Sequence, residues 1–546
     1  MQSEPTLMIL DDVWSKEDLD KLLFEGTRYK TLITSRDSSI ISKKFLNEVY
    51  QLPLLGEQDA LSLLCFWAFG QTSIPSMIDV NLVKKVLEEC GGLPLALKVI
   101  GSSLKGQTHV AWERAKSKIL NGEIISDYYD EGILRCLESS IDSLDDVVKE
   151  CFLDLGLFPK GKKICVDVLL QIWVNIRKIK WQDAIDILFK LARRNLINLS
   201  NNQRIKRTLS YGNALELNFF QHDIIRDLSL YLGCKDNVED RKRLLMPRRE
   251  HDILEKWKLY SNIAFNAQVV SIHTGPMEES QWHEMLFPKA EVLVLLFNAS
   301  EYFLPPFVKT MKNLKIIMVF NYGSKRAILK GLDALSSLNQ LKVVYLEKLI
   351  SIPNESNGNI LDNLENLSLS LCKGIENVPK FNSTKIRSFN LDHCSDLEDL
   401  PSSIFHMPNV QLWSITNCHL VQNLSHSIGN LLNLRVLRLS AMPGLKELPT
   451  SIGALGLLEY LDISLCENLR ELLEEIGKLK SLIELDMREC SSLKKLPKAV
   501  CQLSSLKHVM CDEKIGKQWL QAKRISIPIL EVEIIKLHFS LDWLDD

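Results

Sequence analysis

Hydrophobic residues in the second half of the chain recur in one fixed frame. The frame reads L-x-x-L-x-L-x-x-C from Leu364 to Cys372, and later copies replace some of these residues by other apolar ones. Further copies begin at Ile386, 22 residues after Leu364, and then at Val410, Leu434, Leu458 and Leu482 in steps of 24 residues. Because residues two apart in a strand point to the same side, stacked strands can bury these side chains in one column. The pattern predicts a stack of short strands, and weaker copies at 292–297 and 314–319 extend it upstream.

The 24-residue period lies in the range of leucine-rich repeats, in which each unit supplies one strand and one irregular or helical return segment. The return segments read L-P-x-x-I-G, as in residues 448–453, where proline ends the strand and glycine permits the turn. No single unit could fold alone, because each buries its apolar side only against its neighbours. We therefore predict a horseshoe-shaped solenoid over residues 289–515, closed by a cap at 516–546.

A polar stripe alternates with the buried column and is predicted to face the concave side of the solenoid. Its members are Ser368, Asn390, Ser414, Arg438, Asp462, Asp486, Ser370, Asp392, Thr416, Ser440, Ser464 and Arg488. The stripe lacks aromatic platforms for sugars or single-stranded nucleic acid, which favours a protein partner or another part of the same chain. The alternative is a plainly solvated face. Replacing Asp462 by alanine is expected to cost little stability, whereas Leu461→Ala is expected to cost about 2 to 5 kcal/mol.

The thirteen cysteines are spread along the chain, without a Cys-x-x-Cys pair or a cluster of histidines. Cysteines at one repeat position could form metal or redox sites, since stacked strands lie about 4.8 Å apart. The structural interpretation is preferred, because cysteine is a small residue that is readily buried where an inward side chain closes the turn after the strand. We expect reduced, structural thiols.

Composition sets the broad class. The 546 residues exceed one hydrophobic core, so several domains are expected. The apolar fraction of 46%, the charged fraction of 25% and the absence of an 18-residue apolar run predict a soluble protein without a membrane span. The sequence shows no signal-peptide pattern, so we expect a cytoplasmic protein. A net charge of −3 gives no general attraction to nucleic acid.

The chain opens with an apolar strand pattern, residues 7–10, that ends in the paired carboxylates Asp11 and Asp12. A Walker B segment holds Mg²⁺ beside phosphate in this way. The alternative is an ordinary strand that ends in aspartate at a turn, which is common. Taken alone, the pair does not decide between them.

An ordered series of motifs follows and carries a family resemblance. The motifs are YKTLITSR at 29–36, CGGLPLAL at 90–97, CFLDLGLFP at 151–159 and QHD at 221–223. This series, followed by leucine-rich repeats, resembles the NB-ARC module of plant NLR immune receptors over essentially the whole chain. The QHD form and the segment VSIHTG at 270–275 are most similar to helper NLRs with a powdery-mildew-resistance-type N-terminal domain, of the N-requirement-gene group.

The resemblance implies a role for each of five residues. Asp11 would lie beside Mg²⁺, Asp12 would orient a water, and Arg36 would sense the terminal phosphate through its planar guanidinium. Pro94 would lie against adenine, although its segment also fits a simple loop that enters a buried helix. His222 would hold the diphosphate of ADP, although a lone histidine is more often a satisfied surface or core residue.

The expected fold class is α/β multidomain. Residues 1–54 are predicted as the last part of a P-loop-type parallel sheet and 55–125 as a small helical domain. Residues 126–252 are predicted as a winged-helix domain and 253–288 as a connector to the repeats. A winged helix often binds DNA, but the order of the motifs favours a nucleotide clamp here.

The sequence contains no G-x-x-x-x-G-K-[ST] loop, which in complete relatives precedes the Walker B strand and cradles the phosphates. We therefore expect an N-terminally truncated receptor that binds ADP or ATP weakly or not at all. The expected function is plant defence signalling through other immune-signalling proteins and through contacts between the repeats and the NB-ARC module. The alternative is a nucleotide-independent interaction scaffold or decoy. No catalytic triad or HExxH motif accompanies the Walker B strand, so we do not expect an enzyme.

Overall fold

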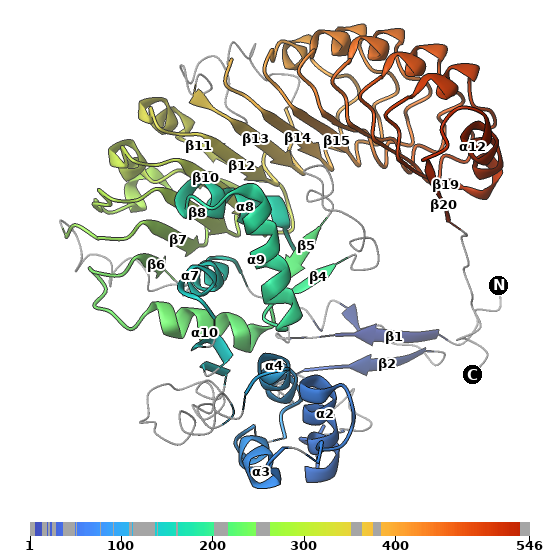
Figure 1. Ribbon diagram of the computed structural model, residues 1–546. Helices are drawn as coiled ribbons and strands as arrows, with labels where there is room; N and C mark the ends of the chain where they lie inside the picture. The colour runs from blue at the N-terminus through green and yellow to red at the C-terminus, as the bar shows by residue number, and fades with distance from the viewer. Residues whose placement is uncertain are drawn as a thin grey trace.

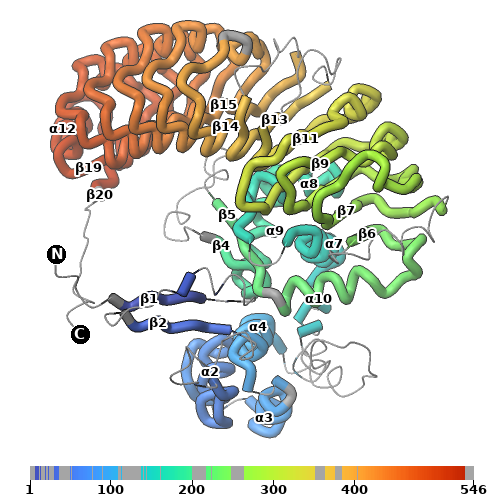
Figure 2. Tube along the Cα trace, turned by 180° about the vertical axis from the view of Figure 1, so that it is seen from behind, coloured from blue at the N-terminus to red at the C-terminus, as the bar shows by residue number. Residues whose placement is uncertain are grey.

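The computed structural model describes residues 6–11, 13, 19, 22–23, 29–35, 50, 52–76, 78–90, 92–108, 112, 137–138, 140–142, 144–159, 162–200, 217–246, 263–350, 363–374 and 384–535. A long parallel sheet curves into an arc, and a group of helices lies against its inner side (Figure 1). The same arrangement is seen from behind in Figure 2. The chain is therefore mixed α/β with a C-terminal repeat solenoid.

The arc is one sheet of thirteen parallel strands in the described part of the chain. The strands are β6 (Arg243–Met246), β7 (Val269–Thr274), β8 (Val292–Phe297), β10 (Ile316–Asn321), β12 (Val343–Glu347), β13 (Asn366–Ser370), β14 (Ser388–Asp392), β15 (Leu412–Thr416), β16 (Val436–Arg438), β17 (Tyr460–Asp462), β18 (Glu484–Met487), β19 (His508–Asp512) and β20 (Glu531–Ile535). The sheet thus begins upstream of residue 289 and continues beyond residue 515. The residues of β6, β7 and β20 match the repeat frame too poorly for the sequence pattern to predict these strands.

A left-handed residue follows most strands and turns the chain into the solenoid. Lys348, Leu371, His393, Asn417, Ala441, Leu465 and Glu489 have φ between 53° and 62°, and an inward Cys or Met comes next from Leu371 on. The Cys466 thiol donates to the Leu439 carbonyl at 2.9 Å, and the Cys490 thiol donates to the Ile463 carbonyl at 3.1 Å. The twelve cysteines in the described part are free, and burial raises the pKa of Cys466 to about 12. The repeated cysteines are structural, as predicted.

The return segments are short 3₁₀ helices on the outer side of the arc. They are η5 (Pro306–Thr310), η6 (Leu332–Ser337), η10 (Ser402–Phe405), η11 (His426–Asn430), η12 (Thr450–Ala454), η13 (Glu474–Lys478) and η14 (Lys498–Gln502). Earlier in the array lie η4 (Glu279–Gln281) and the paired strands β9 (Glu301–Phe303) and β11 (Ile328–Lys330). Proline directly precedes η12 and η14, where its fixed φ suits a helix start. Helix α12 (Glu513–Ile525) buries Trp519 against the last repeats.

A group of helices and a small sheet fills the N-terminal part of the arc. It contains α7 (Asp146–Asp154), η2 (Leu155–Leu157), β3 (Ile164–Cys165), α8 (Val166–Ile176), α9 (Trp181–Arg193), β4 (Asn198–Ser200), β5 (Asn218–Phe220) and α10 (Asp223–Gly233). The three strands pair antiparallel in the order β3, β5, β4. We call this group the α7–α10 unit. It lies within the segment predicted as a winged helix.

The N-terminal elements lie below the α7–α10 unit in Figure 1. They are the parallel pair β1 (Thr6–Leu10) and β2 (Tyr29–Ile33), then α2 (Glu57–Phe69), α3 (Val80–Glu89) and α4 (Pro94–Leu104). Asp79 caps α3 by accepting from the Asn81 amide at 2.9 Å. Leu7, Ile9 and Leu32 of the strand pair are more than half exposed.

The first strands of the arc are buried on both faces. Residues such as Leu293 and Leu295 of β8 point into the solenoid core, whereas Val292, Val294 and Leu296 pack in the same core as the α7–α10 unit. This explains why β8 and β10 read as continuous apolar runs, while later strands alternate apolar with polar residues. None of the helices in the described part is long and apolar enough to cross a membrane.

Candidate functional site

The ends of β1 and β2 bring a carboxylate and a hydroxyl together. The two strands pair in register from Thr6 with Tyr29 to Leu10 with Ile33. The hydroxyl of Thr34 donates to the Asp11 carboxylate, and Asp11 is exposed. The loop is fixed further by the Val13 amide, which donates to the Thr34 carbonyl at 3.0 Å. Asp11 therefore lies at the carboxyl end of a parallel sheet, the place where such folds bind phosphate and its cation. The predicted partners Asp12 and Arg36 lie outside the described residues.

Pro94 is the first residue of α4, and its ring is exposed. The preceding turn requires a glycine, because Gly92 has φ +70° and an added Cβ would lie 2.6 Å from the Leu55 carbonyl oxygen. The Leu55 amide also donates to the Gly92 carbonyl at 3.0 Å. The segment around Pro94 thus fits the simple interpretation of a loop entering a buried helix, and it leaves the proline ring accessible to a planar ligand.

His222 caps the N-terminus of α10. Its ring Nδ1 accepts from the Ile224 amide at 3.4 Å, and the side chain is exposed. Histidine at this position satisfies one of the free amides that every helix start leaves. Asp11, Pro94 and His222 therefore come from three separate elements, namely the end of β1, the start of α4 and the start of α10.

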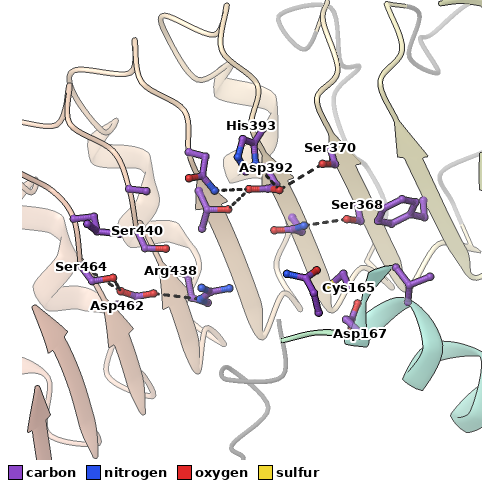
Figure 3. Close-up of a pocket in the computed structure, with 18 residues that line it drawn as sticks. Cys165, Asp167, Ser368, Ser370, Asp392, His393, Arg438, Ser440, Asp462 and Ser464 are labelled. Carbon is purple, nitrogen blue, oxygen red and sulfur yellow. Dashed lines mark hydrogen bonds and ion pairs between the residues drawn. The ribbon is translucent and has the colours of Figure 1, made fainter. Parts of the chain in front are cut away.

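A second candidate site, which the sequence did not predict as a pocket, lies between the α7–α10 unit and the concave face (Figure 3). It is a cavity of about 260 Å³. Cys165, Asp167, Val168 and Asn218 line it from the α7–α10 unit. The repeats supply Tyr345, Ser368, Ser370, Asn390, Asp392, His393, Thr416, Asn417, Arg438, Ser440, Ala441, Asp462, Ser464 and Leu465. Most of the predicted polar stripe therefore faces another part of the same chain.

Asp392 is one of two repeat carboxylates that donors hold along the cavity wall. Asp392 accepts from Thr416 at 2.7 Å, from Asn417 at 2.8 Å and from His393 at 2.8 Å. Burial opposes ionisation of Asp392, but the bond from His393 and the other donors hold its pKa below the usual value. The same bond raises the pKa of His393. The carboxylate on this wall is therefore ionised and satisfied at neutral pH.

Asp462 is fully buried, contrary to a solvated concave stripe. It accepts from the Ser464 amide at 2.9 Å and from the Ser464 hydroxyl at 2.7 Å, and Arg438 Nε lies 3.4 Å from its other oxygen. Ten of the twelve stripe residues are buried, and the next strand pairs Asp486 with Arg488. The expectation that Asp462→Ala costs little is therefore wrong, because the substitution removes a buried charge that three groups contact.

Asp167 brings a third carboxylate to the cavity, from the first turn of α8. It is 8% exposed and accepts from Gln171 Nε2 at 3.3 Å, but no salt bridge reaches it within the described part of the chain. Burial raises its pKa to about 6, although the side chains of Gln171 and Asn366 oppose the rise. Burial also raises the pKa of the neighbouring Cys165 to about 12. This corner of the cavity thus disfavours negative charge.

Charged contacts join the α7–α10 unit to the sheet at two further places. Lys162 Nζ lies 2.6 Å from Glu347 Oε1 on β12 and 5.1 Å from the centre of the Phe320 ring. Asp154, which is fully buried, receives hydrogen bonds from Arg177 at 2.7 and 3.1 Å and from Arg243 of β6 at 2.7 Å. No local pattern in the sequence marks these residues, because their partners lie far away along the chain.

Comparison with known proteins adds a family to this geometry. The NB-ARC domain model matches residues 1–73. Disease resistance protein ADR1 of Arabidopsis thaliana is 41% identical over 549 residues, which cover 99% of this chain and 68% of that protein. The chain belongs to the plant disease resistance proteins with an NB-ARC domain and leucine-rich repeats.

Two further relatives from Arabidopsis thaliana agree with this assignment. A probable disease resistance protein is 42% identical over 73% of this chain and 49% of its own length. A putative disease resistance protein is 38% identical over 73% of this chain and 64% of its own length. This chain spans about half the length of the first of these two relatives.

Proposed function

We propose that this chain acts in plant defence signalling as an NLR of the helper type, in which the state of the NB-ARC module is read out through the repeats. The observation that carries the proposal is the seating of the α7–α10 unit, the proposed winged helix, in the arc of the repeats. A shared apolar core, the Lys162 contact and the Asp154 network all join the two parts. A displacement of the nucleotide module would therefore be transmitted to the repeat surface. Cytoplasmic residence and the lack of catalysis belong to the same proposal.

The residues that would contact nucleotide are Asp11 for Mg²⁺, Pro94 for adenine and His222 for the diphosphate, with Asp12 and Arg36 assigned by resemblance. NB-ARC domains bind nucleotides, so ADP or ATP with Mg²⁺ is the ligand class. The accessible ring of Pro94 and the exposed carboxylate of Asp11 support these assignments. The exposed ring of His222 at the start of α10, where its Nδ1 accepts from the Ile224 amide, supports the diphosphate assignment.

We propose further that residues 1–546 by themselves bind nucleotide weakly. They hold no G-x-x-x-x-G-K-[ST] motif, whose backbone amides and lysine supply most phosphate contacts. Each charge-assisted contact contributes about 1.5 to 3 kcal/mol, so the loss of several moves a micromolar dissociation constant to millimolar or weaker.

Released nucleotide tests this proposal directly. The purified 546-residue chain is denatured, and ADP and ATP are quantified by chromatography, with disease resistance protein ADR1 treated in parallel as the control. We expect substoichiometric nucleotide from this chain, and titration with ADP and Mg²⁺ should give no low-micromolar binding. Stoichiometric nucleotide that Asp11→Ala or His222→Ala abolishes would refute the weak-binding proposal while supporting the site itself.

The second candidate function is a nucleotide-independent scaffold or decoy. The contacts between the α7–α10 unit and the repeats favour it, because none of them involves Asp11, Pro94 or His222. Charge reversal separates the two functions. Lys162→Glu should weaken the contact with β12 and raise protease sensitivity of the α7–α10 unit, and Glu347→Lys in the same chain should restore it. If the defence response depends on this contact but is unchanged by His222→Ala, the scaffold function is the better description.

A further inference from the structure

The last three strands of the arc place one histidine among three glutamates on the concave face. His508 opens β19, and its ring Nδ1 lies 3.5 Å from Glu484 Oε1 of β18. Its ring Nε2 lies 3.3 Å from Glu533 Oε2 of β20. Glu531 is the register partner of His508 on β20. The histidine therefore lies between the carboxylates of both neighbouring strands.

The other charged groups on these strands have contacts of their own. On β18, Asp486 is paired with Arg488, which uses that positive charge locally. On β19 itself, the further titratable groups are Cys511, which is buried, and Asp512, which accepts from the Glu489 amide at 3.0 Å. Glu531 and Glu533 each have another interaction as well. His508 therefore lies within ion-pair distance of Glu484 on one side and of Glu533 on the other.

The position of β20 makes this charge consequential. Among the described strands, β20 is the last of the sheet and pairs with β19 alone, from Glu531 with His508 to Ile535 with Asp512. Edge strands open locally more readily than central ones, because only one ladder of hydrogen bonds holds them. A charge-assisted contact across β19 and β20 therefore adds directly to the small free energy that keeps β20 paired.

We propose that His508, Glu484 and Glu533 form a proton-dependent clasp that holds the terminal strand β20 on the solenoid. With His508 protonated, its ring bridges β18, β19 and β20. With His508 neutral, the contacts with Glu484 and Glu533 lose the charge attraction that joins the three strands. Release of β20 uncovers the edge of β19, which could then pair with an extended peptide segment.

The direction of the pH dependence follows from the histidine. The hydrogen bond and charge of Glu484, with Glu533 and Glu531, raise the pKa of His508, although burial opposes this. A group whose pKa is higher in the paired state stabilises that state most when it is protonated. The clasp is therefore complete below the ordinary pKa of histidine, near 6.5, and is lost as pH rises through the raised value. The loss of the clasp therefore begins above the ordinary histidine pKa, near 6.5.

Hydrogen exchange measured by mass spectrometry tests the clasp in the complete 546-residue chain. Protection factors of peptides covering β20 are compared between about pH 6 and pH 8.5, with EDTA present and observed rates divided by intrinsic rates. We expect the protection of β20 to fall about two- to fivefold across this range, the effect of a partly exposed ion pair. Peptides from β14 to β16 serve as the internal reference and should not change.

Variants separate the clasp from a general effect of pH. His508→Gln should show low β20 protection at both pH values, and Glu533→Gln should move the loss of protection to lower pH. His426→Gln, at an exposed position of η11, should behave like the unmodified chain. An unchanged pH profile in both His508→Gln and Glu533→Gln would overturn the proposal, as would protection that rises with pH. Glu533 is 43% exposed, so its variant tests the proposal even if His508→Gln folds poorly.

Discussion

Replacement of Asp154 by asparagine should separate the α7–α10 unit from the start of the repeat sheet. Asp154 ends α7 and is fully buried, with Arg177 of the same unit and Arg243 of β6 both donating to it. Asparagine keeps the shape of the side chain but removes its charge. Among the described carboxylates, the guanidinium groups of the buried Arg243 and the partly buried Arg177 would then keep only Glu150, which lies 2.7 Å from Arg243 and 3.6 Å from Arg177.

The size of the effect can be worked from these contacts. Breaking a buried ion pair by removing one partner costs about 3 to 5 kcal/mol, because a desolvated charge is left behind. The remaining carboxylate of Glu150 places Asp154→Asn at the lower end, about 3 kcal/mol, or roughly a 150-fold change in the unfolding constant. Asp333→Asn is the matched control. Its ion pair with Lys309 spans 3.2 Å between side chains that are more than half exposed, so its loss should cost under about 0.5 kcal/mol.

Unfolding in guanidinium chloride gives the free energy of unfolding of each variant. Hydrogen exchange of α8, β6 and β7 shows where protection is lost. A double-mutant cycle with Arg243→Gln should give a coupling energy of at least about 1 kcal/mol. Because Arg177 and Arg243 come from the two parts, protection should fall on both sides of the junction. A cost below 1 kcal/mol, or additive single substitutions, would show that Asp154 does not join the unit to the sheet.

Three further predictions concern the core, the cavity and the N-terminal strands. Leu461→Ala should destabilise the repeats by about 2 to 5 kcal/mol, because it leaves a cavity in the core. Leu457→Ala, at a 44% exposed position, should cost under about 0.5 kcal/mol in the same denaturation assay. Equal losses for the two variants would contradict the assigned strand phase. Because the folded pKa of Asp167 is raised to about 6, its ionisation opposes folding, so stability should fall as pH rises from about 4 to 6. Asp167→Asn should therefore be more stable than the unmodified chain at pH 7, by up to about 3 kcal/mol, and equal near pH 4; thermal unfolding at both pH values checks this. In limited proteolysis with mass spectrometry, residues 6–35 should be cut before residues 384–535, and a stable fragment holding only the former would refute this order.

The concave stripe shows what the repeat pattern can predict and what it cannot. Alternation placed Arg438 and Asp462 on the concave face, and the structure confirms that they line the cavity there. Alternation could not tell that both side chains are buried, because burial depends on what lies across the face. The cost predicted for Asp462→Ala was wrong for this reason.

The sequence alone determined the features that local spacing carries. A fixed repeat of 24 residues determines which leucines point inward, and the apolar run before Asp11 determines a strand that ends in a carboxylate. The order of the motifs pointed to the NB-ARC family, which the comparisons confirm. The nucleotide roles of Asp12 and Arg36 stay predictions, because these residues lie outside the described part.

Only the tertiary structure decided which distant segments meet. Lys162 contacts Glu347 across 185 positions of the chain, and Arg243 contacts Asp154 across 89. No periodic pattern encodes such pairs, because a charged residue reads the same in sequence whether it is solvated or buried against a partner. The cavity beside Asp167 and the terminal cluster around His508 arise in the same way. The curvature of the sheet and the packing of the α7–α10 unit within it, which depend on the whole chain, place these groups together.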